Sequence, residues 1–225
     1  MLEPELGRRR TATDLAFERL RQAIINGELK PDERLTETKL AASLHISRTP
    51  LRHAFQRLET EGWVRRTSTG GIRVCGVSDL EIEGLYDVRS SLESLALGQS
   101  IAQIRESDLS NLRSNLEDQR RVLGTGDISA VADLSEAFHR EIWRLSGNHV
   151  CIEFLGKIDD RTKRYRRIAF GGQSNIAQGV TEHEQILDRM AVKDADGARE
   201  LLVLHIEHSR TAVKSAFRGW VNRTG

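Results

Sequence analysis

The sequence predicts a mainly α-helical protein of two domains, a small one over residues 1–76 and a larger one over residues 77–225. Apolar residues recur at helical spacing through most of the chain, and only 3 of its 225 residues are proline. The segments that read as strands all lie before residue 77. A length of 225 residues suits one large domain or two small ones, and the change of pattern favours two.

Composition excludes several classes of protein. Hydrophobic residues make up 38% and charged residues 30% of the chain, which is typical of a globular protein rather than a collagenous or disordered one. No apolar run approaches the roughly 18 residues of a membrane-spanning helix, and MLEPELGRRR lacks the apolar stretch of a signal peptide. Cys75 and Cys151 form no disulfide framework. We therefore expect a cytoplasmic protein without a membrane partner.

The formal charge is unevenly distributed. Residues 1–76 hold 14 Lys/Arg and 10 Asp/Glu, a balance of +4, whereas the remainder has a balance of −3. This modest excess indicates that the first domain meets a polyanion.

The first expected element is a helix over residues 12–26. Thr11 and Asp14 fit a capping pattern, and Gly27 is a natural residue after the last turn. The stretch Glu28–Arg34 reads as a loop.

A short helix over residues 37–44 follows, and a better-defined helix begins after Ser47 and ends at Gly62. His45 lies where the chain must turn sharply, and His is enriched at positive φ. The apolar face of the second helix comprises Leu51, Ala54, Phe55 and Leu58.

Residues 63–66 and 72–74 read as two short strands, with a flexible tip over residues 67–71 between them. A helix, a turn, a second helix and a hairpin together predict a winged helix-turn-helix.

The second helix of this unit offers donors at its N-terminal end. Arg48 and Arg52 share a face at i, i+4, and Arg is the commonest reader of guanine in the major groove. Ser47 and Thr49 lie at the helix N-terminus, which suits a phosphate. The alternative is a solvated basic face, which the preceding helix and the hairpin make less favoured.

From Val77 onward the periodicity is helical, which predicts an antiparallel all-α bundle. The first helix opens with Ser78 as a cap, and the second with Ser107. We expect Leu80, Val88 and Leu95 among the inward residues of the first helix. The remaining four helices are expected over about residues 127–145, 150–170, 175–191 and 194–218.

Three of the seven histidines, His139, His183 and His205, fall next to core positions on three different expected helices. Neutral imidazole is a good ligand for Zn or Ni, so their convergence would make an open metal site. The alternative is a set of hydrogen-bonded core histidines without metal.

Two basic features leave alternatives open. Arg89 either pairs with Glu93 at i+4 on the surface or points into the bundle. The basic run from Arg161 to Arg167 reads as a solvated or interface face, and the sequence does not say which of its members reaches a cavity.

The stretch LTETKLAASLHISRTPLRHAFQRLETE, residues 35–61, resembles the signature of GntR-type bacterial transcription regulators. The resemblance implies that the DNA contacts come from Ser47, Arg48, Thr49 and Arg52, with the hairpin tip at Thr69 and Gly70. Thr38 stands where the family usually has an Arg that reads DNA, and His53 replaces a usual Glu. Both remain candidate DNA contacts.

Residues from about 85 to 209 are similar to the FCD ligand-binding domain of the FadR subgroup, through YDVRSSLE, AFHREIWRLSGN, EHEQIL and HIEHS. The resemblance implies a divalent metal held by His139, His183 and His205, and a carboxylate effector gripped by Arg89. The usual carboxylate ligand is absent, because Ser135 occupies its position. Asp133 lies on the wrong face, and Glu136 is a less natural substitute. We expect water or the effector to complete the site.

The prediction is therefore a ligand-responsive DNA-binding regulator, not an enzyme. It would bind a pseudo-palindromic operator as a homodimer, because one reading head contacts few base pairs. Its effector would be a small organic acid. The alternatives are a three-His metalloenzyme acting on a small carboxylate, which lacks a convincing general base, and a pure metal sensor.

Overall fold

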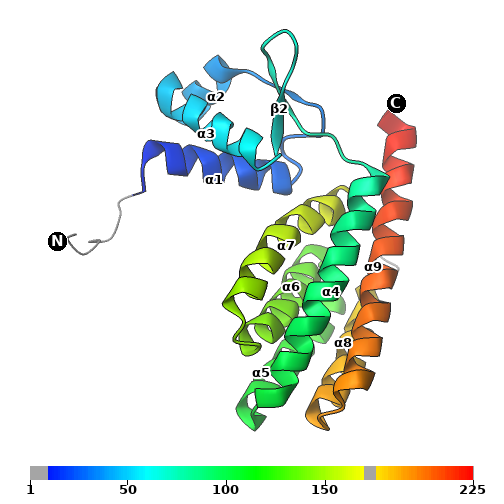
Figure 1. The fold of residues 1–225 in the computed structure, drawn as a ribbon. Coiled ribbons are helices and arrows are strands. Elements are labelled where there is room, and N and C mark those ends of the chain that lie inside the picture. The colour runs from blue at the N-terminus through cyan, green and yellow to red at the C-terminus, as the bar shows by residue number, and fades with distance from the viewer. Residues whose placement is uncertain (1–9, 170–175, 225) are drawn as a thin grey trace, which may run out of the picture. The chain divides into compact units, whose positions relative to one another are not determined.

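The computed structural model describes residues 10–169 and 176–224 (Figure 1). The chain divides into two units, residues 1–77 and 78–225, and each is described by itself.

The first unit begins with α1 (Ala12–Ile25), whose N-terminus carries the expected capping box between Thr11 and Asp14. The helix-turn-helix pair is α2 (Glu37–Ser43) and α3 (Arg48–Thr60). His45 in the turn between them has a φ of 54°, which confirms the expected left-handed position.

Three short antiparallel strands complete the first unit: β1 (Arg34–Leu35), β2 (Val64–Arg66) and β3 (Ile72–Val74). Their order in the sheet is β1-β3-β2, so the hairpin packs beside a strand that precedes α2. The sequence predicts a loop at Arg34, but Arg34 and Leu35 pair with Arg73 and Ile72 and so form β1. Two residues are too few to show the alternating pattern of a strand.

One apolar core holds these elements together. Buried residues of α1 and α3 pack with β-strand residues and with Trp63. The α3 residues in this core are Leu51, Ala54, Phe55 and Leu58, as expected. Burying one face of α3 leaves its opposite face to solvent.

The second unit is a bundle in the part of the chain that the structure describes. Its helices are α4 (Asp79–Gln103), α5 (Glu106–Leu123), α6 (Ile128–Leu145), α7 (His149–Ala169), α8 (Ile176–Ala191) and α9 (Ala195–Thr224). The long helices α4 and α9 run antiparallel and side by side, and α8 also packs on α9 (Figure 1).

Two details of the bundle differ from expectation. Ser107 does not cap α5, because that helix already starts at Glu106 and its N-cap residue is Arg105. The backbone N–H of Arg105 donates to the Asp108 carboxylate at 3.0 Å. On α4, Leu80, Val88 and Leu95 are exposed rather than inward. The buried face of α4 is a mixed one that contains Ile82, Tyr86, Arg89, Glu93, Ala96, Leu97, Ser100 and Ile101.

Candidate functional site

The exposed face of α3 presents the basic residues expected to read DNA. Arg48, Arg52 and His53 are all exposed. Arg52 Nε donates to Glu37 Oε2 at 3.0 Å, and the Arg52 side chain remains 60% exposed. Because exposed ion pairs contribute only about 0–1 kcal/mol, this contact lets the guanidinium turn toward a nucleic acid.

The N-terminus of α3 is open to solvent. Ser47 occupies the N-cap position, but its side chain makes no capping hydrogen bond within the described chain. Thr49 follows in the first turn and is exposed as well. Hydroxyl groups and free backbone N–H groups at a helix start suit a phosphate oxygen.

The remaining candidate DNA contacts lie at two other exposed places of the first unit. Thr38 is exposed on α2, and Thr69 and Gly70 form the hairpin tip. Gly70 has a φ of 78°, which a residue with a side chain adopts only with strain. All eight candidate residues are therefore accessible, and their contacts with DNA stay a prediction.

The helical unit encloses a cavity of about 280 Å³. This volume is near the lower end of ligand pockets, which are roughly 300–1,000 Å³. Residues from α4 to α9 line the cavity, and the lining includes Arg89, His139 and His205. The cavity therefore suits a small molecule.

The structure brings His139, His183 and His205 together, from α6, α8 and α9. Their Nε2 atoms form a nearly equilateral triangle with sides of 3.1, 3.2 and 3.3 Å. All three side chains are buried. Among the described residues, these histidines are the group that can hold a metal ion.

Each of the three rings has an acceptor at its other nitrogen. His205 Nδ1 lies 2.7 Å from Glu182 Oε2, and His139 Nδ1 lies 2.8 Å from Glu93 Oε2, a close contact that does not meet the geometry of a hydrogen bond. His183 Nδ1 lies 3.2 Å from the Gln119 side-chain oxygen. A proton on each Nδ1 leaves three Nε2 lone pairs directed at one point.

A chain of amides fixes the direction of Gln119. Asn115 Nδ2 donates to the Leu134 carbonyl at 3.2 Å, which leaves Asn115 Oδ1 as an acceptor. Gln119 Nε2 donates to that oxygen at 2.7 Å. The Gln119 oxygen must then face His183, so the ring donates from Nδ1.

Burial favours the neutral form of two of these imidazoles, His183 and His205. Burial, together with the neighbouring His205 and His139, places the pKa of His183 well below 6.5. Burial also lowers the pKa of His205 to about 4, although Glu182 opposes this shift. Neutral imidazole is the form that ligates a metal.

The triangle has the size that a metal requires. With Zn–N bonds of about 2.0–2.1 Å, tetrahedral geometry separates neighbouring nitrogens by about 3.3 Å. The observed separations of 3.1–3.3 Å match this value. Three converging lone pairs repel one another unless a cation lies among them, so the donor set fits a divalent metal.

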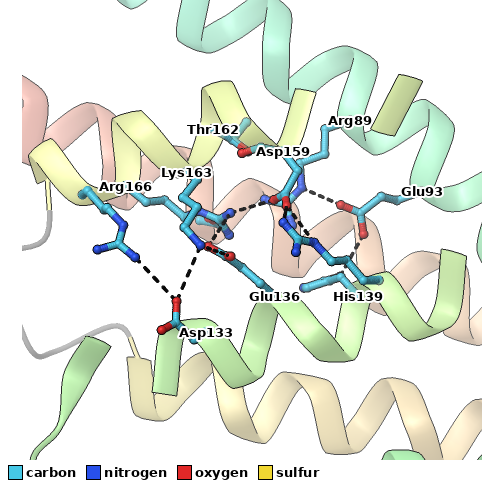
Figure 2. Close-up of polar contacts among 12 residues, drawn as sticks. Arg89, Glu93, Asp133, Glu136, His139, Asp159, Thr162, Lys163 and Arg166 are labelled. Atoms are coloured by element: carbon cyan, nitrogen blue, oxygen red, sulfur yellow. Dashed lines mark hydrogen bonds and ion pairs between the residues drawn. The ribbon is translucent and has the colours of Figure 1, made fainter. Parts of the chain in front are cut away.

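Arg89 and Glu93 form a buried ion pair beside the histidines. Arg89 Nε donates to Glu93 Oε1 at 2.5 Å, and Figure 2 shows the contacts running from Arg89 through Glu93 to His139. Burial raises the pKa of Glu93, but the charge of Arg89 outweighs it and holds the pKa below its usual range. The sequence left open a surface pair with Glu93 or an Arg89 that points into the bundle; Arg89 points inward and pairs with Glu93 there.

One nitrogen of Arg89 has no partner. Its Nη1 is buried and makes no hydrogen bond within the described residues. The Arg89 side chain lines the cavity and is 3% exposed. A buried guanidinium with an unused N–H group is a natural anchor for a carboxylate.

Neither Asp133 nor Glu136 is available as a fourth ligand beside the histidines. Ser135 lines the cavity at the position of the usual acidic ligand. Asp133 lies 3.6 Å from both Lys163 and Arg167, and Glu136 accepts from Lys163 at 2.6 Å. Neither acid joins the three histidines.

Sequence reasoning missed the residues that support the histidines. Gln119 continues the apolar stripe of Leu109, Leu112 and Leu116 on α5, and a polar residue on such a stripe was a readable signal. Glu182 gave no signal, because its partners His205 and His208 lie on another helix.

Within the described part of the chain, no helix combines the length and the apolar composition that a membrane span requires.

A winged helix-turn-helix with an exposed basic α3, together with a helical unit that encloses a cavity, defines a DNA-binding transcription regulator. Residues 13–74 match the model of bacterial regulatory proteins of the gntR family, and residues 84–208 match the FCD domain. The chain therefore belongs to the GntR family of bacterial regulators, with an FCD domain.

Known relatives agree with this assignment. The chain is 26% identical to the uncharacterized HTH-type transcriptional regulator YdhC of Bacillus subtilis, over 85% of this chain and 86% of that protein. It is 30% identical to an HTH-type regulator in an unstable DNA locus of Streptomyces ambofaciens, over 84% and 79%. The structure of McbR/YncC from E. coli shares the fold, with a TM-score of 0.77 and 21% identity over 92% of this chain and 99% of that one. The two relatives matched by sequence are named as transcriptional regulators, not as enzymes.

Proposed function

We propose that this regulator senses a small carboxylic acid through a divalent metal, Zn or Ni, held by His139, His183 and His205. The effector changes the affinity of a homodimer for a pseudo-palindromic operator. The observation that carries the proposal is the triangle of Nε2 atoms, 3.1–3.3 Å on a side, with an acceptor at every Nδ1.

The chemistry of the cavity supports an acid as the effector. A divalent metal supplies positive charge and open coordination positions for an anionic oxygen. The three histidines bring no negative charge to the metal, and Ser135 adds none. Arg89 contributes its buried Nη1, which has no partner in the described chain. An anionic ligand would meet the charge of the metal and the unused N–H group of Arg89.

The small size of the first unit supports a dimer. Each α3 presents two arginines at one end, Arg48 and Arg52, which together contact only a few base pairs. Two copies on two half-sites supply the specificity that a genome demands. The acid regulates the operator only if it binds one arrangement of the dimer better than the other.

Metal analysis tests the site. We expect about one metal ion per chain in the wild type and a large loss in His183→Ala and His205→Ala, because each removes one of three ligands. His149→Ala is the matched control, since His149 is exposed at the start of α7 and does not line the cavity. Equal metal content in all variants contradicts the site.

Operator binding tests the regulation. Fluorescence anisotropy of metal-loaded protein on its operator, with and without a panel of small acids, should show one acid that shifts the affinity 5–150-fold, the usual range of allosteric coupling. The same acid should act only weakly on Arg89→Met. An acid response that persists after chelation removes the metal from the proposal.

A further inference from the structure

A second buried guanidinium lines the same cavity. Arg166 comes from α7, which also carries Asp159, and its side chain is 11% exposed. Arg166 belongs to the basic run from Arg161 to Arg167, for which the sequence predicts a solvated or interface face. Its Nε is buried and makes no hydrogen bond to the described residues.

Fixed carboxylates hold Arg166 in place. Its Nη2 donates to Asp159 Oδ1 at 3.0 Å and to Glu136 Oε1 at 3.3 Å, in the polar network of Figure 2. Asp159 in turn accepts from Arg140 at 2.7 Å. The guanidinium is therefore oriented before any ligand arrives, which reduces the entropy lost on binding.

The residues that line the cavity carry more positive than negative charge. Apart from the histidines, the charged groups in its described lining are Arg89, Arg166 and Glu182. Both oxygens of Glu182 already accept hydrogen bonds, from His205 at 2.7 Å and from His208 at 2.6 Å. Arg89 and Arg166 thus face the cavity as two cations, each with one nitrogen lacking a partner in the described chain.

We propose that Arg166 is a second anion anchor and that the effector is a dicarboxylate, held by Arg89 at one end and by Arg166 at the other. This inference rests on the proposed function and narrows its ligand. A monocarboxylate would satisfy the unpartnered N–H group of one guanidinium and leave that of the other buried without a hydrogen bond, which costs the desolvation of that N–H group. Arg166 then determines specificity, whereas Arg89 serves every acid that binds.

Titration calorimetry on the metal-loaded full chain tests the inference with pairs of equal carbon length: succinate against butyrate, and glutarate against pentanoate. We expect the better diacid to bind at least tenfold more tightly than its monoacid partner. In Arg166→Gln this ratio should fall to within about twofold, with the monoacid affinity unchanged, because a charge-assisted hydrogen bond is lost only at the far end.

Arg167→Gln is the matched control. Arg167 is the next residue on α7, faces Asp133 at 3.6 Å and does not line the cavity, so its loss should leave the ratio intact. Circular dichroism and metal content verify that each variant is folded and loaded. If Arg166→Gln does not fold, Arg166→Lys takes its place, and its diacid affinity should fall at least threefold while its monoacid affinity stays constant.

The outcomes separate the two proposals. An Arg166 variant that keeps the wild-type ratio, or wild type that binds diacid and monoacid equally, overturns the second anchor and leaves acid sensing intact. If the wild type takes up metal but binds none of the acids, both the second anchor and acid sensing are overturned. Equal loss of monoacid and diacid in Arg166→Gln also overturns the specificity role.

Discussion

Gln119→Leu tests the reasoning about the three histidines without touching a ligand. The substitution keeps the volume of the side chain but removes the oxygen that lies 3.2 Å from His183 Nδ1. Without that acceptor, His183 no longer gains by placing its proton on Nδ1, and a proton on Nε2 blocks the lone pair that faces the centre.

The magnitude follows from known effects of such supporting hydrogen bonds. Their loss typically weakens metal binding about 10–100-fold. At about 1.4 kcal/mol per tenfold change, the expected loss is about 1.4–2.8 kcal/mol. The effect should be smaller than that of His183→Ala, which removes the ligand itself.

Competition with a chromophoric zinc chelator at fixed pH measures the affinity. Gln99→Leu is the matched control, because it also removes an amide oxygen that accepts from Asn148 at 3.2 Å, in the same unit. The control should bind zinc as the wild type does. A zinc affinity of Gln119→Leu within twofold of wild type would refute the argument that this amide sets the tautomer.

Three further predictions concern DNA, pH and metal. Arg52→Ala should weaken specific operator binding by about 1–3 kcal/mol, whereas Arg21→Ala on α1 should change it little; anisotropy at one salt concentration compares them, and equal losses would contradict the role of α3. Asp159→Asn should destabilise the protein at neutral pH by about 3 kcal/mol, the low end for a broken buried pair because its partner Arg140 is half exposed. Burial raises the pKa of Asp159, but the charge of Arg166 and the hydrogen bond from Arg140 outweigh it and hold the pKa below 3.8. The stabilisation is therefore complete above pH 3.8 and is lost as pH falls through the folded pKa, so urea unfolding should show the two proteins converging in acid; a constant difference would be inconsistent. In a solution whose free metal concentration is 100 times Kd, adding a chelator should lower the free energy of unfolding by about 2.7 kcal/mol, or Tm by about 5–10 °C. An unchanged Tm would argue against metal binding.

Local features of the fold were predictable from the sequence. The capping pair Thr11 and Asp14, the turn at His45 and the apolar face of α3 all depend on neighbours within a few residues. Physical rules for caps, positive φ and helical period therefore sufficed.

The inward face of α4 was predicted incorrectly at three positions. Leucine and valine periodicity favoured Leu80, Val88 and Leu95 as inward residues, yet all three are at least 48% exposed. The helix instead buries Arg89 and Glu93, which stabilise each other as an ion pair. A pattern of hydrophobicity cannot show that two charged residues will compensate each other inside the bundle.

The candidate site was predictable in its centre and not in its surroundings. One histidine on each of three helices, together with the family resemblance, indicated His139, His183 and His205. Their partners Glu93, Gln119 and Glu182 come from α4, α5 and α8, so their contacts depend on how helices pack rather than on sequence spacing.

The origin of the histidines on separate helices also bears on the unfolded chain. His139 and His205 are 66 residues apart in sequence. An ion that binds only the folded chain would close a loop of that length on folding, and its binding free energy would add to the stability of the fold, by about 2.7 kcal/mol at a free-ion concentration of 100 times Kd. The zinc concentration would then determine how much of this regulator stays folded and resists proteolysis, in addition to the role of the metal in sensing an acid.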